Sequence, residues 1–325
     1  MKFGLLSPQG FLYGLPKDST SALRKIMKLA EIAEELGFHS VWVTDHFIPF
    51  PFITSDNVLE AWTLLSFLAS KTYKIRLGTL VTCNLYRFPT VLAKMASTLD
   101  VLSRGRLEFG IGACWYAEEF SRYGITYPRF SERIRMLDEA LEIIKLSWTK
   151  REVNYHGKYY RVKGLIMEPK PIQKPHSPVV IGGSSKSILY VVAKHANKWN
   201  YMGEPKFIKK KYGFIRKECL RLGRKNCNIK ITYLTWIISD KNTSSLTIYL
   251  LKFVSLFARR TLSKIALRDL KILFRPGGYI LGTYAMITEK IRELEDMGVS
   301  ELIIYFPIVS EEVIENFTKH VIDKV

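Results

Sequence analysis

The sequence predicts a (β/α)8 barrel, also called a TIM barrel, and two observations support that prediction. Eight short apolar segments are separated, nearly always, by stretches whose apolar residues follow the helical period. The segments also end in polar or glycine-containing runs, as parallel strands do where they meet their connecting loops. An open, doubly wound sheet is the alternative, but it seldom contains eight regular strand–helix units.

The predicted elements alternate from the N-terminus. The strands are expected at Lys2–Leu6, Ser40–Thr44, Ile75–Val81, Arg106–Ile111, Val179–Ile181, Trp199–Met202, Ile229–Ile238 and Glu301–Phe306. The first helix begins at Asp18 or Ser19, which can cap it, and ends at Gly37. The clearest amphipathic helix is Ser131–Trp148, whose apolar residues form one stripe.

The third strand shows best how a strand passes into a functional loop. Its front half is apolar, but Asn84 favours a turn and Pro89 donates no backbone hydrogen bond. The strand must therefore end before the next helix, Thr90–Leu102, begins. Proteins of the α/β class bind ligands at such strand ends, so we expect the site at this end of the barrel.

We expect a single domain over 1–325, with an insertion between strands 4 and 5. The insertion covers about 151–178, where Val153–Val162 predicts a hairpin about His156-Gly157 and a proline-rich run follows. A second segment, about 239–277, is divergent and expected to be helical. Neither segment has the composition of a linker between domains.

The formal charge of +19 is concentrated between Lys206 and Lys230. Nucleic-acid-binding proteins combine such charge with a recognisable binding motif, and none is visible here. Apolar residues within the segment, such as Phe214 and Ile215, favour a helix with a solvated basic face. We therefore expect no nucleic-acid partner, although a basic surface also attracts anionic ligands.

The sequence also predicts location and redox state. The Pro-Gln-Gly run at 8–10 ends the first apolar stretch too early for a signal peptide. The most apolar stretch, Leu246–Ala258, contains Lys252 and is too short to span a bilayer. Paired metal-ligand spacing is missing from the four cysteines, Cys83, Cys114, Cys219 and Cys227. We expect a cytoplasmic protein with free thiols and no membrane contact.

A parallel barrel brings the carboxyl ends of all its strands to one rim. The residues placed there are Asp45, His46, Leu80 to Asn84, Ala113 to Trp115, and Gly182 to Ser184. They include no pair of acids close in sequence, no nucleophile elbow and no metal-ligand spacing, so hydrolysis is poorly supported and no metal is expected. A rim short of reactive groups favours a cofactor that supplies the chemistry.

Two motifs at the rim allow more than one interpretation. The Gly182-Gly183-Ser184 sequence precedes a helix, so it either presents backbone N–H groups to a phosphate or forms a tight turn that needs positive φ. In one interpretation, Asp45 caps the next turn and His46 is a partly buried imidazole with its hydrogen bonds satisfied. In the other, both side chains are functional groups. Their position at a strand end favours the functional interpretation.

The remaining cysteine and histidine positions favour structural roles. Cys114 is interpreted as a small packing residue, because no basic partner is evident beside it. The histidines outside the strand ends are interpreted as structural or solvated; they are His156, His176, His195 and His320.

Several motifs occur in a fixed order along most of the chain. They are Trp42-Val-Thr-Asp-His-Phe47, Arg76-Leu-Gly-Thr-Leu-Val-Thr82, Leu99-Asp-Val-Leu-Ser-Arg-Gly-Arg106, Gly110-Ile-Gly-Ala-Cys-Trp115, Pro178-Val-Val-Ile-Gly-Gly183 and Leu281-Gly-Thr283. Together they resemble the bacterial luciferase-like superfamily of flavin and deazaflavin proteins. Within it, the chain is most similar to the coenzyme F420-dependent oxidoreductases, especially over Arg76–Phe120.

This resemblance implies a barrel that binds F420, or FMN in the luciferase branch, at its C-terminal rim. It implies a cis peptide bond at Leu80–Val81 in a bulge of the third strand, which supports the back of the ring. Asp45 would hydrogen-bond to the deazaflavin. His46 would be the catalytic residue and would lie near the reacting face, where it would donate a proton, accept a proton or polarise the reacting group.

The same resemblance places Ala113 and Cys114 at the ring edge, and Gly182 and Gly183 at the phosphate end of the tail. Relatives often have glycine at the position of Cys114. A sugar-phosphate dehydrogenase of the family has an acidic catalytic residue at the position of Trp115, so its substrate is not carried over. The resemblance also implies a homodimer.

The expected function is an F420-dependent oxidoreductase that transfers a hydride between C5 of the deazaflavin and a small organic substrate. An FMN-dependent monooxygenase working with a separate flavin reductase is the alternative. A barrel that binds flavin without turnover is a third possibility, which crowding of the ring by Cys114 would favour.

Overall fold

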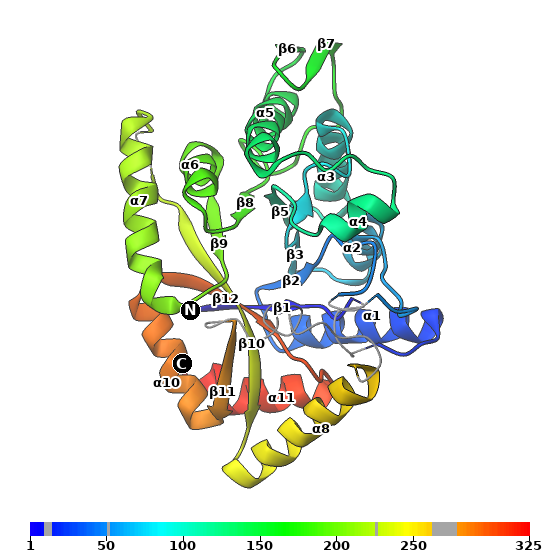
Figure 1. Cartoon of the computed structure of the whole chain (residues 1–325), viewed down its shortest axis with the longest axis vertical. Helices are drawn as coiled ribbons and strands as arrows, with labels where there is room; N and C mark the ends of the chain where they lie inside the picture. The colour runs from blue at the N-terminus through cyan, green and yellow to red at the C-terminus, as the bar shows by residue number, and fades with distance from the viewer. Residues whose placement is uncertain (10–14, 51–52, 225–226, 262–277) are drawn as a thin grey trace. The chain divides into compact units, whose positions relative to one another are not determined.

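The computed structural model describes residues 1–9, 15–50, 53–224, 227–261 and 278–325 (Figure 1). The strands are β1 (Lys2–Leu6), β2 (Ser40–Val43), β3 (Arg76–Thr79), β4 (Thr82–Cys83), β5 (Leu107–Gly112), β6 (Val153–His156), β7 (Arg161–Leu165), β8 (Val179–Gly182), β9 (Lys198–Tyr201), β10 (Lys230–Asp240), β11 (Tyr279–Thr283) and β12 (Val299–Tyr305). The α-helices are α1 (Ser19–Glu35), α2 (Ala61–Lys71), α3 (Pro89–Leu102), α4 (Ala117–Arg122), α5 (Phe130–Thr149), α6 (Lys186–His195), α7 (Ile208–Arg221), α8 (Thr243–Thr261), α10 (Tyr284–Asp296) and α11 (Glu311–His320).

The strand order confirms the predicted fold class. Parallel pairing runs β11-β10-β12-β1-β2-β3-β5-β8-β9, β4 pairs with β5, and β9 also pairs with β10. The pairing of β9 with β10 closes the sheet into a (β/α)8 barrel. The eight predicted strands are all present, and β11 is an additional strand on β10 that the sequence did not suggest.

The chain divides into two compact units. Unit 1 comprises Met1–Leu59, Tyr201–Lys210 and Ile231–Val325, and unit 2 comprises Glu60–Asn200 and Lys211–Lys230. The organisation as one domain over 1–325 stays a prediction.

In unit 1, β1 pairs in parallel with both β2 and β12, so that Leu5 lies opposite Val41 on one side and Ile304 on the other. All three side chains are buried, as expected for a parallel strand covered on both faces. The cap predicted for α1 is confirmed, because the Asp18 carboxylate accepts a hydrogen bond of 2.7 Å from the Ser21 N–H.

In unit 2, β5 is the central strand and is buried along its whole length. It pairs with β3, β4 and β8. The Phe109 ring lies 6.0 Å from the Trp62 ring and 5.0 Å from the Trp148 ring, which belongs to the predicted stripe of α5. Aromatic contacts at these distances add to the burial that holds α2 and α5 on the strand.

The predicted insertion is confirmed as a hairpin between β5 and β8. Strands β6 and β7 pair antiparallel, with His156 opposite Arg161. The chain then passes through two cis prolines, Pro169 and Pro175, before β8. In the divergent segment, about 239–277, helix α8 confirms the expectation of helix for 243–261. Residues 262–277 lie outside the described residues.

The basic segment forms helix α7, as expected. Its buried face carries Ile208, Ile215 and Cys219, while Lys209 and Arg216 are exposed. The solvated basic face predicted from the sequence is therefore confirmed. Among the described residues, no helix combines the length and hydrophobicity that crossing a membrane requires.

Candidate functional site

The interruption between β3 and β4 is the most distinctive backbone feature of unit 2. The peptide bond Leu80–Val81 is cis, as the family resemblance implied. Thr82 and Cys83 then resume pairing with β5, although the sequence suggested that this half of the segment would leave the sheet. Val81 is only partly buried, whereas Leu80 is 8% exposed.

Glycines on the neighbouring strands leave space for the backbone and side chains at the interruption between β3 and β4. A Cβ atom on Gly110 would lie 1.8 Å from the Thr79 carbonyl oxygen, and one on Gly112 would lie 2.8 Å from Val81 Cγ2. A Cβ on Gly182 would lie 3.2 Å from both Val81 methyl groups. These glycines therefore let the Val81 side chain pack against the ends of β5 and β8.

The four cysteines are not free thiols, so that expectation was wrong. Cys83 is bonded to Cys114, and Cys219 is bonded to Cys227. The first bond forms because β4 lies beside β5 with Cys83 opposite Gly112, two residues before Cys114. The sequence separation of 31 gave no indication of this proximity. Cys114 is consequently a covalently tied residue and not merely a packing residue.

The four residues after β5, Ala113–Tyr116, form a segment that we call the rim loop. Arg133, which is 6% exposed, donates from Nε to the Ala113 carbonyl at 3.0 Å. The Tyr127 hydroxyl donates to the Trp115 carbonyl at 3.1 Å, and the Arg133 guanidinium lies 4.0 Å from the centre of the Tyr127 ring. The rim loop is therefore tied at three successive residues, two of them through backbone carbonyls.

Arg133 was missed in the sequence. It comes from the first part of α5, next to Ile134 in the apolar stripe, and also donates to the Pro128 carbonyl at 2.6 Å. A basic residue beside the buried stripe of an amphipathic helix was the available indication, since a buried guanidinium needs carbonyl or carboxylate partners.

At the end of β8, the structure supports the turn interpretation for Gly183. Its φ is +129°, its N–H donates to the Asn200 carbonyl at 3.2 Å, and its carbonyl accepts from Trp199 Nε1 at 2.7 Å. Helix α6 begins three residues later, where the Ser185 hydroxyl accepts from the Ile188 N–H. The first N–H groups of a helix have no intrahelical acceptor, so a phosphate seat remains a prediction for Ser184 and its neighbours.

Lys211 brings positive charge to the same strand end. Its ammonium group donates to the Ser184 carbonyl at 2.7 Å. The sequence placed this lysine only in the basic helix and did not connect it to the rim. The contact with Ser184 comes from α7 and is part of unit 2.

Asp45 and His46 lie in unit 1, directly after β2. Asp45 is 3% exposed, and His46 is partly buried. Gln9, which is 1% exposed, accepts from the Thr44 N–H at 2.9 Å through its side-chain oxygen and donates to the Leu59 carbonyl. Gln9 thus fixes the backbone just before Asp45, a role that sequence reasoning missed. The roles of Asp45 and His46 stay predictions.

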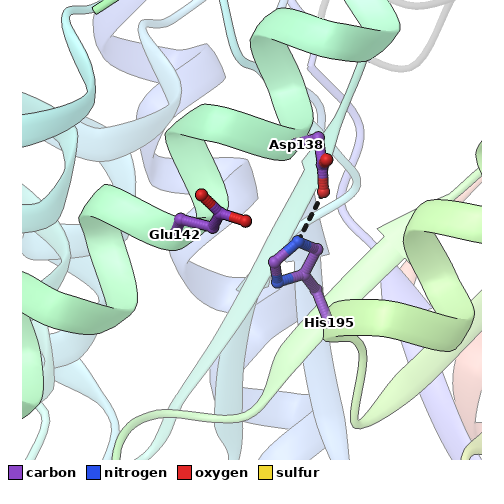
Figure 2. Close-up of side chains that lie close together, drawn as sticks. All are labelled: Asp138, Glu142 and His195. Atoms are coloured by element: carbon purple, nitrogen blue, oxygen red, sulfur yellow. Dashed lines mark hydrogen bonds and ion pairs between the residues drawn. The ribbon is translucent and has the colours of Figure 1, made fainter. Parts of the chain in front are cut away.

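A charged cluster lies between α5 and α6 of unit 2 (Figure 2). Asp138, Glu142 and His195 place three possible metal-ligand atoms within 4.8 Å of one another. His195 Nε2 lies 2.7 Å from an Asp138 oxygen. Burial lowers the pKa of His195, and its hydrogen bond to Asp138 offsets this only in part.

Lys194 supplies the positive charge that this cluster needs. Its ammonium group lies 3.0 Å from Asp138 and 2.6 Å from Glu142. Burial acts to raise the pKa of Asp138, but the hydrogen bonds from His195 and Lys194 outweigh it and lower that pKa. Because the lysine satisfies both carboxylates, we interpret the cluster as a tie between two helices, in line with the structural role expected for His195.

Comparison with known families identifies the chain. The family model described as luciferase-like monooxygenase matches residues 1–301. The chain belongs to this family. Among curated relatives of this luciferase-like protein, the F420-dependent glucose-6-phosphate dehydrogenase of Amycolatopsis mediterranei is 32% identical over 182 residues, which are 54% of this chain and 51% of that protein.

A second curated relative has a different cofactor. The FMNH(2)-dependent dimethylsulfone monooxygenase of Pseudomonas putida is 30% identical over 160 residues, 49% of this chain and 43% of that protein. The luciferase-like chain thus spans about half the length of the curated relatives it matches.

Solved structures share the fold over its whole length. An F420-dependent secondary alcohol dehydrogenase in complex with an F420–acetone adduct has a TM-score of 0.81 at 19% identity, covering 100% of this chain and 98% of its own. The EDTA monooxygenase of Chelativorans sp. BNC1 has a TM-score of 0.82 at 15% identity, covering 99% and 92%. At these identities the likeness concerns the fold.

Proposed function

We propose that this luciferase-like protein is an enzyme, an F420-dependent oxidoreductase that transfers a hydride between the cofactor and a small organic substrate. The observation that carries the proposal is the character of the strand ends in unit 2. Their residues contribute glycines, apolar side chains, a disulfide and tied backbone carbonyls. Such a surface can hold and orient a reactive group, but it offers few reactive groups of its own.

The residues present are compatible with a flat ring that ends in a phosphate-bearing tail. Val81 packs closely against Gly112 and Gly182 and keeps part of its surface exposed, so it can support one face of a ring. The Cys114 side chain is bonded to Cys83, which keeps it from projecting freely toward a ring edge. Lys211 and the N-terminus of α6 supply positive potential beside Ser184 for the anionic end.

When bound, F420 supplies reversible hydride exchange at its C5 position. The remaining steps belong to the protein. The backbone at Leu80–Val81 would support the ring, Ala113 and Cys114 would limit its edge, and Gly182, Gly183 and Ser184 would receive the tail. Asp45 would hydrogen-bond to the ring system, and His46 would hold or move the proton that accompanies the hydride. The roles of Asp45 and His46 rest on the sequence resemblance alone.

An FMN-dependent monooxygenase is the second candidate, favoured by the relative from Pseudomonas putida. The sugar-phosphate substrate of the Amycolatopsis relative is not transferred, because Trp115 stands where an acidic catalytic residue is expected in such enzymes. A homodimeric assembly and a cytoplasmic location stay predictions.

Titration of the purified protein with F420 and with FMN, each oxidised and reduced, tests the cofactor assignment. We expect F420 to bind at least about tenfold more tightly than FMN, which corresponds to roughly 1.4 kcal/mol. Fluorescence quenching or calorimetry measures both affinities. Tighter binding of FMN would move the function to the monooxygenase branch, and binding of neither would reject the enzyme assignment.

The His46→Ala variant tests the proton-handling role. Loss of a positioned acid–base group lowers turnover by about 10²–10⁴-fold, whereas F420 affinity should change little because the backbone and Asp45 are retained. Single-turnover reaction with a panel of small alcohols and carbonyl compounds measures the rate. His156→Ala, on the exposed hairpin, is the matched control. Unchanged turnover in His46→Ala would remove this residue from the mechanism.

A further inference from the structure

The Cys83–Cys114 bond joins two segments that both belong to the rim of unit 2. Cys83 ends β4, the strand that follows the Leu80–Val81 interruption, and Cys114 is the second residue of the rim loop. The Asn84 N–H also donates to the Gly112 carbonyl at 3.1 Å, which continues the pairing of β4 with β5. The disulfide therefore joins two of the segments that the proposed function assigns to cofactor binding.

Cys114 occupies a backbone conformation that a side chain disfavours. Its φ is +62°, in the left-handed region that glycine enters freely and other residues enter at a cost. A residue persists there only where its surroundings enforce the conformation. The side chain that makes this conformation unfavourable is also the one that bonds to Cys83. The disulfide therefore helps to hold Cys114 at positive φ.

The two neighbouring ties of the rim loop are noncovalent. Arg133 holds the Ala113 carbonyl, and Tyr127 holds the Trp115 carbonyl. Without the disulfide, the residue between them would keep its unfavourable φ and lose its own attachment. Cys114 is also the more exposed partner, since it is half-buried and next to the half-exposed Trp115, whereas Cys83 is 5% exposed.

We propose that Cys83 and Cys114 form a reversible thiol–disulfide modification site, whose redox state sets the order of the rim loop and thereby cofactor affinity. The effect on the loop is independent of the cofactor, and the effect on affinity rests on the proposed function. The reacting partner is a dithiol, either a small molecule or a protein.

The exchange is balanced as follows. A thiolate of the dithiol attacks the Cys114 sulfur, the Cys83–Cys114 bond breaks, and Cys83 leaves as a thiolate that takes up a proton. The second thiol of the partner then attacks its own sulfur in the mixed disulfide and releases Cys114 as a thiol. The dithiol is oxidised to its disulfide, and its two protons and two electrons remain on Cys83 and Cys114.

The second disulfide provides a matched control within the same unit. Cys219–Cys227 closes a segment with a sequence separation of 8 at the end of α7, and Cys219 is fully buried. The Cys219 sulfur lies 3.5 Å from the Ala193 carbonyl oxygen, on α6 and not in the rim loop. Removing it should therefore leave the redox response of the loop intact.

The first experiment measures the loop directly. Intact protein, oxidised or treated with dithiothreitol, is alkylated and mapped by mass spectrometry, and amide hydrogen exchange is followed at 113–116. We expect reduction to speed exchange there by about tenfold, a factor within the range of the backbone cost that the bond offsets. The Cys83→Ser/Cys114→Ser variant should exchange at the reduced rate under both conditions, and Cys219→Ser/Cys227→Ser should respond like the wild type.

The second experiment measures F420 affinity and separates the tie from the backbone cost. Cys83→Ser/Cys114→Ser lacks the tie and keeps a side chain at positive φ, whereas Cys83→Ser/Cys114→Gly lacks the tie and removes that cost. We expect affinity to fall in the order oxidised wild type, glycine variant, serine variant, with the reduced wild type equal to the serine variant. The first and last should differ by about tenfold.

Equal exchange rates at 113–116 in the oxidised and reduced protein would overturn the proposal, as would retention of the bond under dithiothreitol. A redox-dependent loop with equal F420 affinity in both states would reject the link to the cofactor. If no state binds F420 or FMN, the proposed function fails while the exchange data still decide whether the site controls the loop.

Discussion

The rim loop and the α5–α6 cluster are both built around side chains of α5, yet they are arranged in opposite ways. In the cluster, Lys194 pairs with both Asp138 and Glu142. His195 lies against Asp138 (Figure 2). At the rim loop, Arg133 directs its donors to backbone carbonyls. The charges of the cluster hold two helices together, whereas at the rim one buried cation holds a loop in place.

Under the proposed function, a concentration of titratable groups is a poor guide to the functional site in this protein. Three possible metal ligands converge in the cluster, but Lys194 neutralises the carboxylates, and further positive charge comes from Lys145 nearby. The rim has few titratable groups and a fixed backbone. A fixed surface of this kind suits a bound group that brings its own chemistry.

Removal of Arg133 should have the largest effect. The Arg133→Leu variant replaces the buried guanidinium with an apolar side chain. The Ala113 and Pro128 carbonyls then lose the hydrogen bonds that the guanidinium donates to them. We expect a loss of about 3 kcal/mol in the free energy of unfolding, together with weaker F420 binding, because two charge-assisted hydrogen bonds are lost. Urea denaturation and the cofactor titration measure the two effects.

Arg135 is the matched control for this prediction. It lies on the same helix but is exposed, and it donates to the Tyr159 hydroxyl at 2.9 Å. Arg135→Leu should change stability by no more than about 0.5 kcal/mol. If Arg133→Leu lowered stability but left F420 affinity unchanged, the rim loop would have only a structural role, and the contrast with the cluster would disappear.

The barrel was predictable because its strands and helices differ in periodicity over whole segments. Ser131–Trp148 predicted α5 to within one residue at each end, and the eight predicted strands are all present. Strand β11 was missed because its apolar run, Tyr279 to Leu281, is short and passes at once into Gly282 and Thr283, and only one of its five residues is buried. Short edge strands carry the weakest sequence pattern.

The candidate site was predictable only in part. The cis bond at Leu80–Val81 followed from the family motifs, and the positions after the strands followed from the strand ends of a parallel barrel. The Cys83–Cys114 bond did not, because it depends on the register of β4 against β5. The pairing of Asp138 with His195, 57 residues apart, likewise requires the packing of α5 on α6. Contacts between segments distant in sequence leave no local pattern in a single chain.

A smaller loss of stability than that of Arg133→Leu is expected for Asp138→Asn in the cluster. The amide keeps the size of the side chain but loses the charge that pairs with Lys194 and that strengthens the hydrogen bond with His195, so we expect a loss of about 1–2 kcal/mol in the free energy of unfolding. F420 affinity should not change. The folded pKa of Asp138 lies below its ordinary value of 3.8, so the carboxylate contributes stability above that pH. The difference between wild type and variant should therefore shrink as the pH falls below 3.8 and through the lowered pKa of the folded state.

Divalent cations provide the control for the interpretation of this cluster as a helix tie. Because Lys194 already occupies the space between the carboxylates, zinc or manganese ions should not raise the melting temperature of the wild type. Lys194→Met removes that positive charge and should destabilise the protein, since the carboxylates of Asp138 and Glu142, one turn apart on α5, then lie beside each other without this cation. A rise in melting temperature with metal in the wild type, or a loss of F420 affinity in Asp138→Asn, would contradict the separation of the two regions. The cluster would then belong with the rim, as part of a functional site.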